Sequence, residues 1–214
     1  MKKIVAFIAA AMLGITAFAQ QAEEILSKME QVMSGNDADG LIMTFEMKIP
    51  ILGTISSKTK ALGDKMRMEV TSMGKVAYSW NDSAAGTSWT YDPEKNTITI
   101  ENYSPSDSSK ESGDAEMFTG VAEGYGVSIK KETDKAWYIA CKKLKTNTNK
   151  DDPKNMEIVV AKGSYMPLSL SAKTKGITIT IKDLAYGVKE SDVTFDASKY
   201  PGATIVDKRE PAAE

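Results

Sequence analysis

Between residues 64 and 103, large apolar side chains recur at every second position in several short runs. A period of two places alternate side chains on one face of a β-sheet. Methionine is flexible and polarizable, so a face rich in Met, Trp and Tyr can repack around an apolar guest. We therefore predict a sheet that lines a cavity. The alternating residues are Met66, Met68, Val70, Val76, Tyr78, Trp80, Trp89, Tyr91, Ile98 and Ile100.

Further strands are predicted on both sides of this segment. The run 41–49 alternates cleanly and ends at Pro50, and Asp92-Pro93 is a strong turn signal. Short strands separated by turn residues at such intervals predict a mainly β fold, built as one large curved antiparallel sheet or an open barrel. The other predicted strands cover residues 52–61, 127–132, 137–144, 155–161, 167–172 and 176–182.

Two helices interrupt the strands. Residues 21–34 carry Ala22, Ile25, Leu26 and Met29 at helical spacing, and Gly35 follows as a stop. Residues 114–123 place Phe118 and Val121 on one side of a second predicted helix, next to a Ser- and Asp-rich loop. Such a helix is either a lid over a concave sheet or a simple crossover connection.

The N-terminus has the pattern of a secretory signal peptide. Lys2 and Lys3 precede an apolar run from Ile4 to Thr16, and Ala17-Phe18-Ala19 provides small residues around a cleavage site. We expect residues 1–19 to be removed, leaving Gln20 first and an exported protein without a lipid anchor. Residues 20–207 then form one domain, and 208–214 form a polar tail.

Composition narrows the possible functions. The chain has no histidine, which removes the commonest general base and metal ligand. The predicted signal peptide holds two of the 27 basic residues and none of the 29 acidic ones, so the rest has a net charge of −4. This charge argues against nucleic acid as a partner. The single cysteine, Cys141, is predicted to be a buried thiol. We expect no cofactor, no metal site and no enzymatic activity.

The ordered set of motifs resembles the LolA family of periplasmic lipoprotein carriers. The likeness lies in the first helix, in Lys65-Met66-Arg67-Met68, in Trp89-Thr90-Tyr91-Asp92-Pro93, and in the closing run from Phe195 to Ala203. The resemblance implies an unclosed half-barrel with helices covering its concave face. It also implies a monomeric periplasmic carrier that moves acylated lipoproteins from an inner-membrane exporter to an outer-membrane acceptor.

On this basis we predict an acyl-chain cavity with a lid and a rim. Arg67, whose parity is opposite to that of Met66 and Met68, is predicted at the rim or solvated on the convex face. Ile25, Leu26, Met29, Phe118 and Val121 are predicted to cover the cavity. Its predicted lining is Phe45, Met47, Met66, Met68, Tyr78, Trp80, Trp89, Tyr91, Ile98, Ile100 and Ile158.

Three alternatives remain open at this stage. The same half-barrel resembles periplasmic sensors of lipid or mislocalised lipoprotein, which bind one regulatory partner. A hydrolase would have to use carboxylates such as those of Asp107, Glu111, Asp114 and Glu116, in a polar loop. A surface-exposed structural protein is the third alternative, with Asp82-Ser83-Ala84 as an O-glycan acceptor at Ser83.

Overall fold

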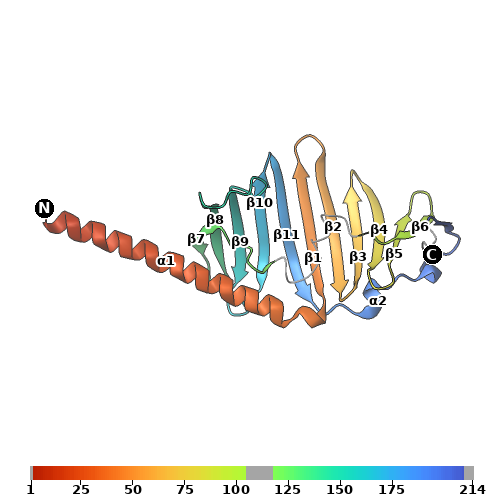
Figure 1. Cartoon of the computed structure of the whole chain (residues 1–214), viewed down its shortest axis with the longest axis horizontal. Helices are drawn as coiled ribbons and strands as arrows, with labels where there is room; N and C mark the ends of the chain where they lie inside the picture. Colours follow the sequence, from red (N-terminus) through yellow and green to blue (C-terminus); the bar gives the residue numbers. More distant parts are fainter. Residues whose placement is uncertain (1, 105–117, 210–214) are drawn as a thin grey trace.

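The protein is built around a single twelve-stranded sheet, as seen in a computed structural model (Figure 1). The structure describes residues 2–104 and 118–209. The strand order is β12-β6-β5-β4-β3-β2-β1-β11-β10-β9-β8-β7. The strands are β1 (Leu41–Ile49), β2 (Gly53–Leu62), β3 (Lys65–Ser72), β4 (Lys75–Asp82), β5 (Thr87–Asp92), β6 (Thr97–Asn102), β7 (Tyr125–Glu132), β8 (Ala136–Lys143), β9 (Asn155–Ala161), β10 (Pro167–Thr174), β11 (Ile177–Tyr186) and β12 (Thr204–Asp207).

Helices flank the sheet at both ends of the chain. Helix α1 (Lys2–Gly35) is continuous through the predicted signal peptide, and its first half projects away from the sheet (Figure 1). A short 3-10 helix, η1 (Asp37–Asp39), leads into β1, while α2 (Glu190–Val193) and η3 (Ala197–Lys199) precede β12. Across the described ranges, no helix combines the length and the apolar character needed to span a membrane.

The main core lies between α1 and one face of the sheet, which we call the helix face. A row of paired residues crosses this face from β8 to β1: Ile139 pairs with Ile158, then come Leu170, Ile181 and Phe45. Ala22, Ile25, Leu26, Met29 and Met33 of α1 pack on this side and are buried. Cys141 is buried in the same core, and burial raises the pKa of its thiol to about 11, so it is protonated near neutral pH.

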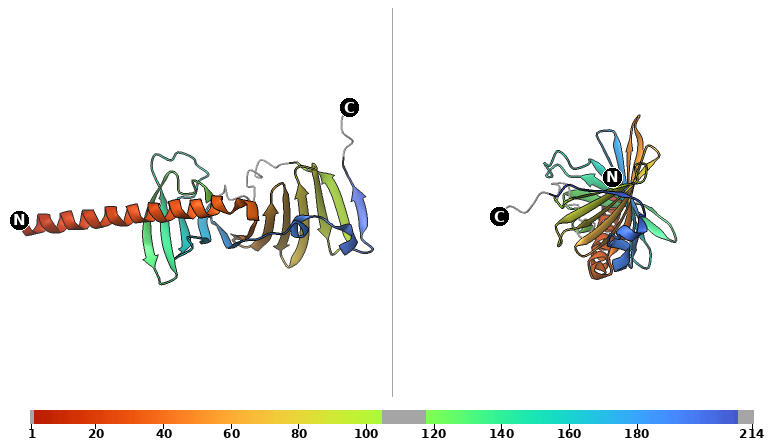
Figure 2. Two further views of the ribbon diagram at one scale, coloured as in Figure 1. Left: turned by 90° about the horizontal axis from the view of Figure 1, so that it is seen from below. Right: turned by 90° about the vertical axis from the view of Figure 1, so that its right-hand side faces the viewer.

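The opposite face, which we call the arm face, changes character along the sheet. At its centre it is charged, with Glu46 of β1 paired to Lys182 of β11 at 2.9 Å. Toward β4, β5 and β6 it becomes aromatic and is covered by residues 188–207, which we call the C-terminal arm. Figure 2 (left) shows α1 running along the half of the sheet that holds β7–β10 and this arm along the half that holds β3–β6.

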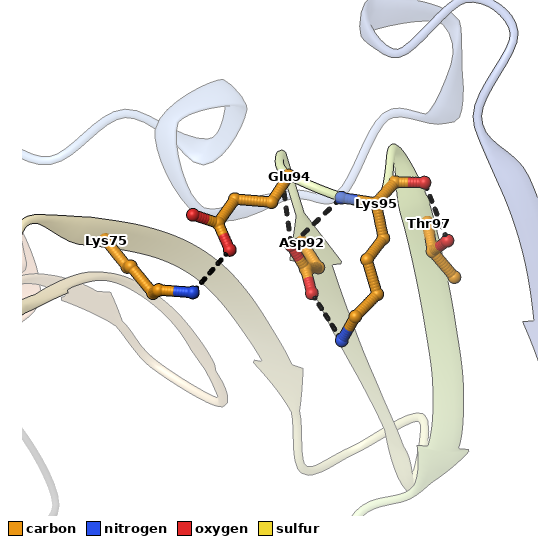
Figure 3. Close-up of polar contacts among 5 residues, drawn as sticks. All are labelled: Lys75, Asp92, Glu94, Lys95 and Thr97. Atoms are coloured by element: carbon orange, nitrogen blue, oxygen red, sulfur yellow. Dashed lines mark hydrogen bonds and ion pairs between the residues drawn. The ribbon is translucent and has the colours of Figure 1, made fainter.

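Turn chemistry fixes how neighbouring strands pair. Met73 and Gly74 join β3 to β4 with φ of 52° and 79°, as a two-residue hairpin with positive φ at both positions requires. In the turn between β5 and β6, Asp92 Oδ1 accepts hydrogen bonds from the backbone N–H groups of Glu94 and Lys95 (Figure 3). Lys75 Nζ contacts Glu94 Oε2 at 2.8 Å and ties β4 to this turn. The Asp92-Pro93 signal is thus confirmed.

The predicted fold class is confirmed: within residues 2–104 and 118–209 the protein is mainly β, and its sheet is unclosed and accompanied by two α-helices. Three details differ. Strand β12 pairs in parallel with β6, whereas all other neighbours are antiparallel. Residues 118–124 form turns instead of the end of an α-helix, and 114–117 lie outside the described ranges. The two helices do not share the concave face. Helix α1 packs on the helix face, whereas α2 lies on the arm face, where its Asp192 contacts Lys60.

Candidate functional site

The residues predicted to line one cavity are divided between the two faces of the sheet. Arg67 of β3 pairs with Trp80 of β4, and Trp80 pairs with Trp89 of β5, so these three side chains share the arm face. Met66 and Met68 alternate with Arg67 and therefore lie on the helix face. The prediction that these methionines share a face with Tyr78 and Trp80 is wrong. The β3–β4 hairpin has a two-residue turn, and such a turn pairs odd-numbered with even-numbered residues.

On the helix face, exposure of the predicted residues increases with distance from α1. Ile158 is fully buried beneath the helix, and Phe45 packs partly buried against the core. Beyond Phe45, half-buried apolar side chains continue on both sides of β2, whose Ser57 and Thr59 lie between them on the same face. We call this half-buried region the open strip. It consists of Phe45, Met47, Ile55, Met66, Met68, Val70 and Ile179.

The predicted lid residues belong to the core at the other end of the helix face. Ile25, Leu26 and Met29 are buried, Phe118 is fully buried, and Val121 packs against them. The backbone N–H of Gly120 donates to Glu30 Oε1 at 3.0 Å, which ties the turns after Phe118 to α1. A cavity of about 290 Å³ lies here, bordered by Leu26, Glu30 and Val127 among others. The structure therefore places these residues over β7 and β9 instead of over the open strip.

The aromatic residues form a tightly packed cluster on the arm face. Trp89 stacks on Phe195 with ring centres 5.4 Å apart, and Trp80 meets the same ring edge-on at 5.3 Å. Tyr91 lies 4.4 Å from Tyr200 by ring centres. Burial raises the pKa of the Tyr200 hydroxyl, an effect that the positive charge of Arg67 opposes. Ile98 is buried beside this cluster, whereas Tyr78 and Ile100 are half-buried.

Sequence analysis missed the roles of Phe195 and Tyr200. Both were noted only as part of the closing run that resembles the LolA family. Their spacing carried a usable signal, because two aromatic residues in a polar segment need an apolar partner elsewhere in the chain. The structure shows that partner to be the Trp80–Trp89 cluster.

Arg67 lies on the arm face among the aromatic rings. Its Cζ is 5.7 Å from the ring centre of Tyr78 and 5.6 Å from that of Trp80. A second cavity, of about 160 Å³, lies between Arg67, Trp80 and the C-terminal arm. Arg67 is therefore half-buried beneath the arm instead of solvated on an open convex face.

The metal, carboxylate and glycan-acceptor predictions concern other parts of the chain. In the described ranges, no group of three or more His, Cys, Asp or Glu side chains could hold a metal ion. Asp107, Glu111, Asp114 and Glu116 all lie outside those ranges. Ser83 is exposed at a turn, where its hydroxyl is 3.2 Å from Asp64 Oδ1.

Comparison with known proteins finds similar folds and no similar sequences. No family model and no curated protein sequence matches the chain. A solved structure of a conserved protein from Thermus thermophilus is similar at a TM-score of 0.46 and 13% identity, over 88% of this chain and 99% of that one. A LolA superfamily protein from Nitrosomonas europaea is similar at a TM-score of 0.35 and 9% identity, over 82% and 98%.

Lipoprotein LppX of Mycobacterium tuberculosis is similar at a TM-score of 0.44 and 12% identity, covering 81% of this chain and 99% of that one. The structures found thus include a protein of the LolA superfamily, the family that the sequence motifs resemble. Identities and TM-scores this low leave the function to be inferred from the site itself.

Proposed function

We propose that this protein binds acyl chains of lipids or lipidated proteins along the open strip and carries them through the periplasm. The observation that carries this proposal is the half-buried, methionine-rich surface next to α1. Contiguous apolar side chains that a protein leaves partly exposed commonly mark an interaction site. The strip continues the apolar row that runs beneath α1. A bound acyl chain would therefore lie next to the hydrophobic core, from which water is already excluded.

The energetics suit a carrier. Each buried methylene contributes about 0.8 kcal/mol, so a long acyl chain in water costs on the order of 12 kcal/mol. A soluble protein must cover most of that chain and must also release it. Met47, Met66 and Met68 can change shape with little strain, which supports binding without a rigid pocket.

Replacing Met68 by Asp tests the strip directly. Met68→Asp places a charge in the middle of the apolar surface, and palmitate should bind at least about tenfold more weakly. Met73→Asp is a matched control, because Met73 is an exposed turn residue at 79% exposure. Isothermal titration calorimetry on protein purified without detergent provides the dissociation constants. Equal weakening in both variants, or no binding to the unmodified protein, contradicts the proposal.

A fluorescent reporter locates the bound chain. Phe45→Trp puts an indole in the strip, and we expect brominated fatty acid to quench it. The unmodified protein, with Trp80 and Trp89 on the arm face and Trp137 on β8, gives the reference signal. Equal quenching in the variant and in the unmodified protein would contradict binding along the strip.

We further propose that cargo passes from an inner-membrane exporter to an outer-membrane acceptor, with the carrier acting as a monomer. The alternative is a sensing module of the same fold, which binds one regulatory protein. Affinity capture from periplasm distinguishes the two. A carrier should retain many acylated proteins, and a sensor should retain one partner whether or not lipid is present.

A further inference from the structure

The guanidinium of Arg67 is held in place without a hydrogen-bond partner within residues 2–104 and 118–209. Its contacts are with the faces of the Tyr78 and Trp80 rings, and its Nε atom is buried and unpaired. Ring faces attract the positive charge but accept none of its five N–H donors in the plane of the fork. A buried donor without an acceptor is rare in folded proteins and indicates a missing partner.

The missing partner has space next to Arg67. The cavity of about 160 Å³ is bounded on one side by Arg67 and Trp80 and on the other by the C-terminal arm. The arm contributes Ser191, Asp192, Thr194, Asp196, Lys199 and Tyr200 to its lining. This volume suits a small polar group and is too small for a long acyl chain.

Both acidic side chains that line the cavity have hydrogen-bond or ion-pair partners within the chain. Asp192 Oδ1 lies 3.1 Å from Lys60 Nζ, and its Oδ2 accepts a hydrogen bond from the Lys189 backbone N–H. Asp196 Oδ1 accepts hydrogen bonds from the backbone N–H and the hydroxyl of Ser198.

Neither Arg67 nor Lys199 has an ion pair within 4 Å among the residues that the structure describes. Arg67 and Lys199 thus balance the two carboxylates of the lining in number, and the buried Nε atom of Arg67 is left without a hydrogen-bond partner.

We propose that this cavity binds a small oxyanion, a phosphate or a carboxylate, through the guanidinium of Arg67. A guanidinium presents parallel N–H groups that match two oxygens of such an anion. The stacked rings of Tyr78 and Trp80 hold the guanidinium in one plane, so little side-chain freedom is lost on binding. This site is independent of the proposed acyl-binding function, because it lies on the opposite face of the sheet.

Titration with inorganic phosphate at constant ionic strength tests the proposal. Phosphate should bind the unmodified protein, and Arg67→Gln should weaken binding about tenfold or more, since it removes charged hydrogen bonds. Lys58→Gln is the matched control: Lys58 is a cation on the same face of β2 but does not line the cavity. Absence of binding by phosphate, glycerol phosphate and acetate alike, or equal loss in both variants, overturns the proposal.

Two further measurements guard against misfolding and identify the ligand source. Amide chemical shifts of the unmodified protein should move within residues 191–200 on phosphate addition, a result that needs no variant. Shifts spread over surface lysines instead would overturn the site. Glycerol phosphate and acetate, titrated in parallel, distinguish a lipid headgroup and a carboxylate from free phosphate. Binding of phosphate, glycerol phosphate or acetate supports the site if Arg67→Gln abolishes it.

Discussion

Ile51 adopts a backbone conformation that is unfavourable for its side chain. It sits at the tip of the β1–β2 hairpin with φ of 73°, and its side chain is fully exposed. A left-handed conformation costs an L-residue about 1–2 kcal/mol, and β-branched residues tolerate it poorly. An exposed side chain has no packing to offset this cost. The strain at Ile51 is therefore a local loss of stability.

Ile51→Gly should raise the free energy of unfolding by about 1 kcal/mol, because glycine adopts positive φ without strain. Chemical denaturation measures the change. Leu52→Gly is the control: Leu52 is also exposed, at 62%, but its φ is not positive, so glycine there should not stabilise the protein. A decrease in stability for Ile51→Gly would show that the side chain makes an unrecognised contact.

Single residues also show where sequence reasoning succeeds and fails. The alternation of Met66, Met68 and Val70 correctly predicted a strand, because periodicity depends only on neighbours along the chain. Which face of the sheet these side chains occupy depends on pairing with β4. That pairing follows from the two-residue turn at Met73-Gly74, whose length was readable from the sequence but was not used.

At the scale of elements, the C-terminal arm is held by two ion pairs as well as by its aromatic rings. Lys65 contacts Glu190, and Lys60 contacts Asp192. The hydrogen bond from Lys65 lowers the pKa of Glu190 below its ordinary 4.5, and the Lys189 backbone N–H, together with Lys60, lowers the pKa of Asp192 below 3.8. Both carboxylates therefore stabilise the docked position of the C-terminal arm only while they are ionised.

We expect the arm to loosen in acid. Since both folded pKa values are lowered, the stabilisation is complete above the ordinary values of 4.5 and 3.8 and is lost as the pH falls through the lowered ones. Emission of Trp80 and Trp89, followed from about pH 6 to about pH 2, should shift to longer wavelength as their cover by Phe195 is lost. In the Glu190→Gln, Asp192→Asn double variant this shift should shrink, and an unchanged acid transition would exclude the two carboxylates as its cause.

For the whole molecule, the fold class followed from local patterns, but the arrangement of its covers did not. Strand spacing and the amphipathic run from Ala22 to Met33 were sufficient for a large open sheet with a helix on it. The second cover needed knowledge of long-range contacts, such as Phe195 on Trp89 and β12 on β6. The prediction of a single cavity was wrong for the same reason. It placed all of the lining residues on one face of the sheet, whereas strand pairing divides them between two.

Removal of the predicted signal peptide should leave the fold intact. The described core contacts of α1 begin at Ala22, after the expected cleavage site. Protein that starts at Gln20 should therefore unfold at the same temperature as the full chain, measured by circular dichroism. Protein exported to the periplasm should have the mass of residues 20–214. An intact N-terminus after export, or a clear fall in unfolding temperature on truncation, would contradict this expectation.

The two covers of the sheet come from opposite ends of the chain, α1 from the beginning and the arm from the end. The residues of α1 are therefore synthesised before those of any strand. The rings of Trp80, Trp89 and Tyr91, in contrast, remain uncovered until Phe195 and Tyr200 have been synthesised. Contacts that join segments about 100 residues apart form slowly. We therefore expect the aromatic cluster to be the last hydrophobic surface to be covered, and a newly made chain to be prone to self-association until β12 has paired with β6.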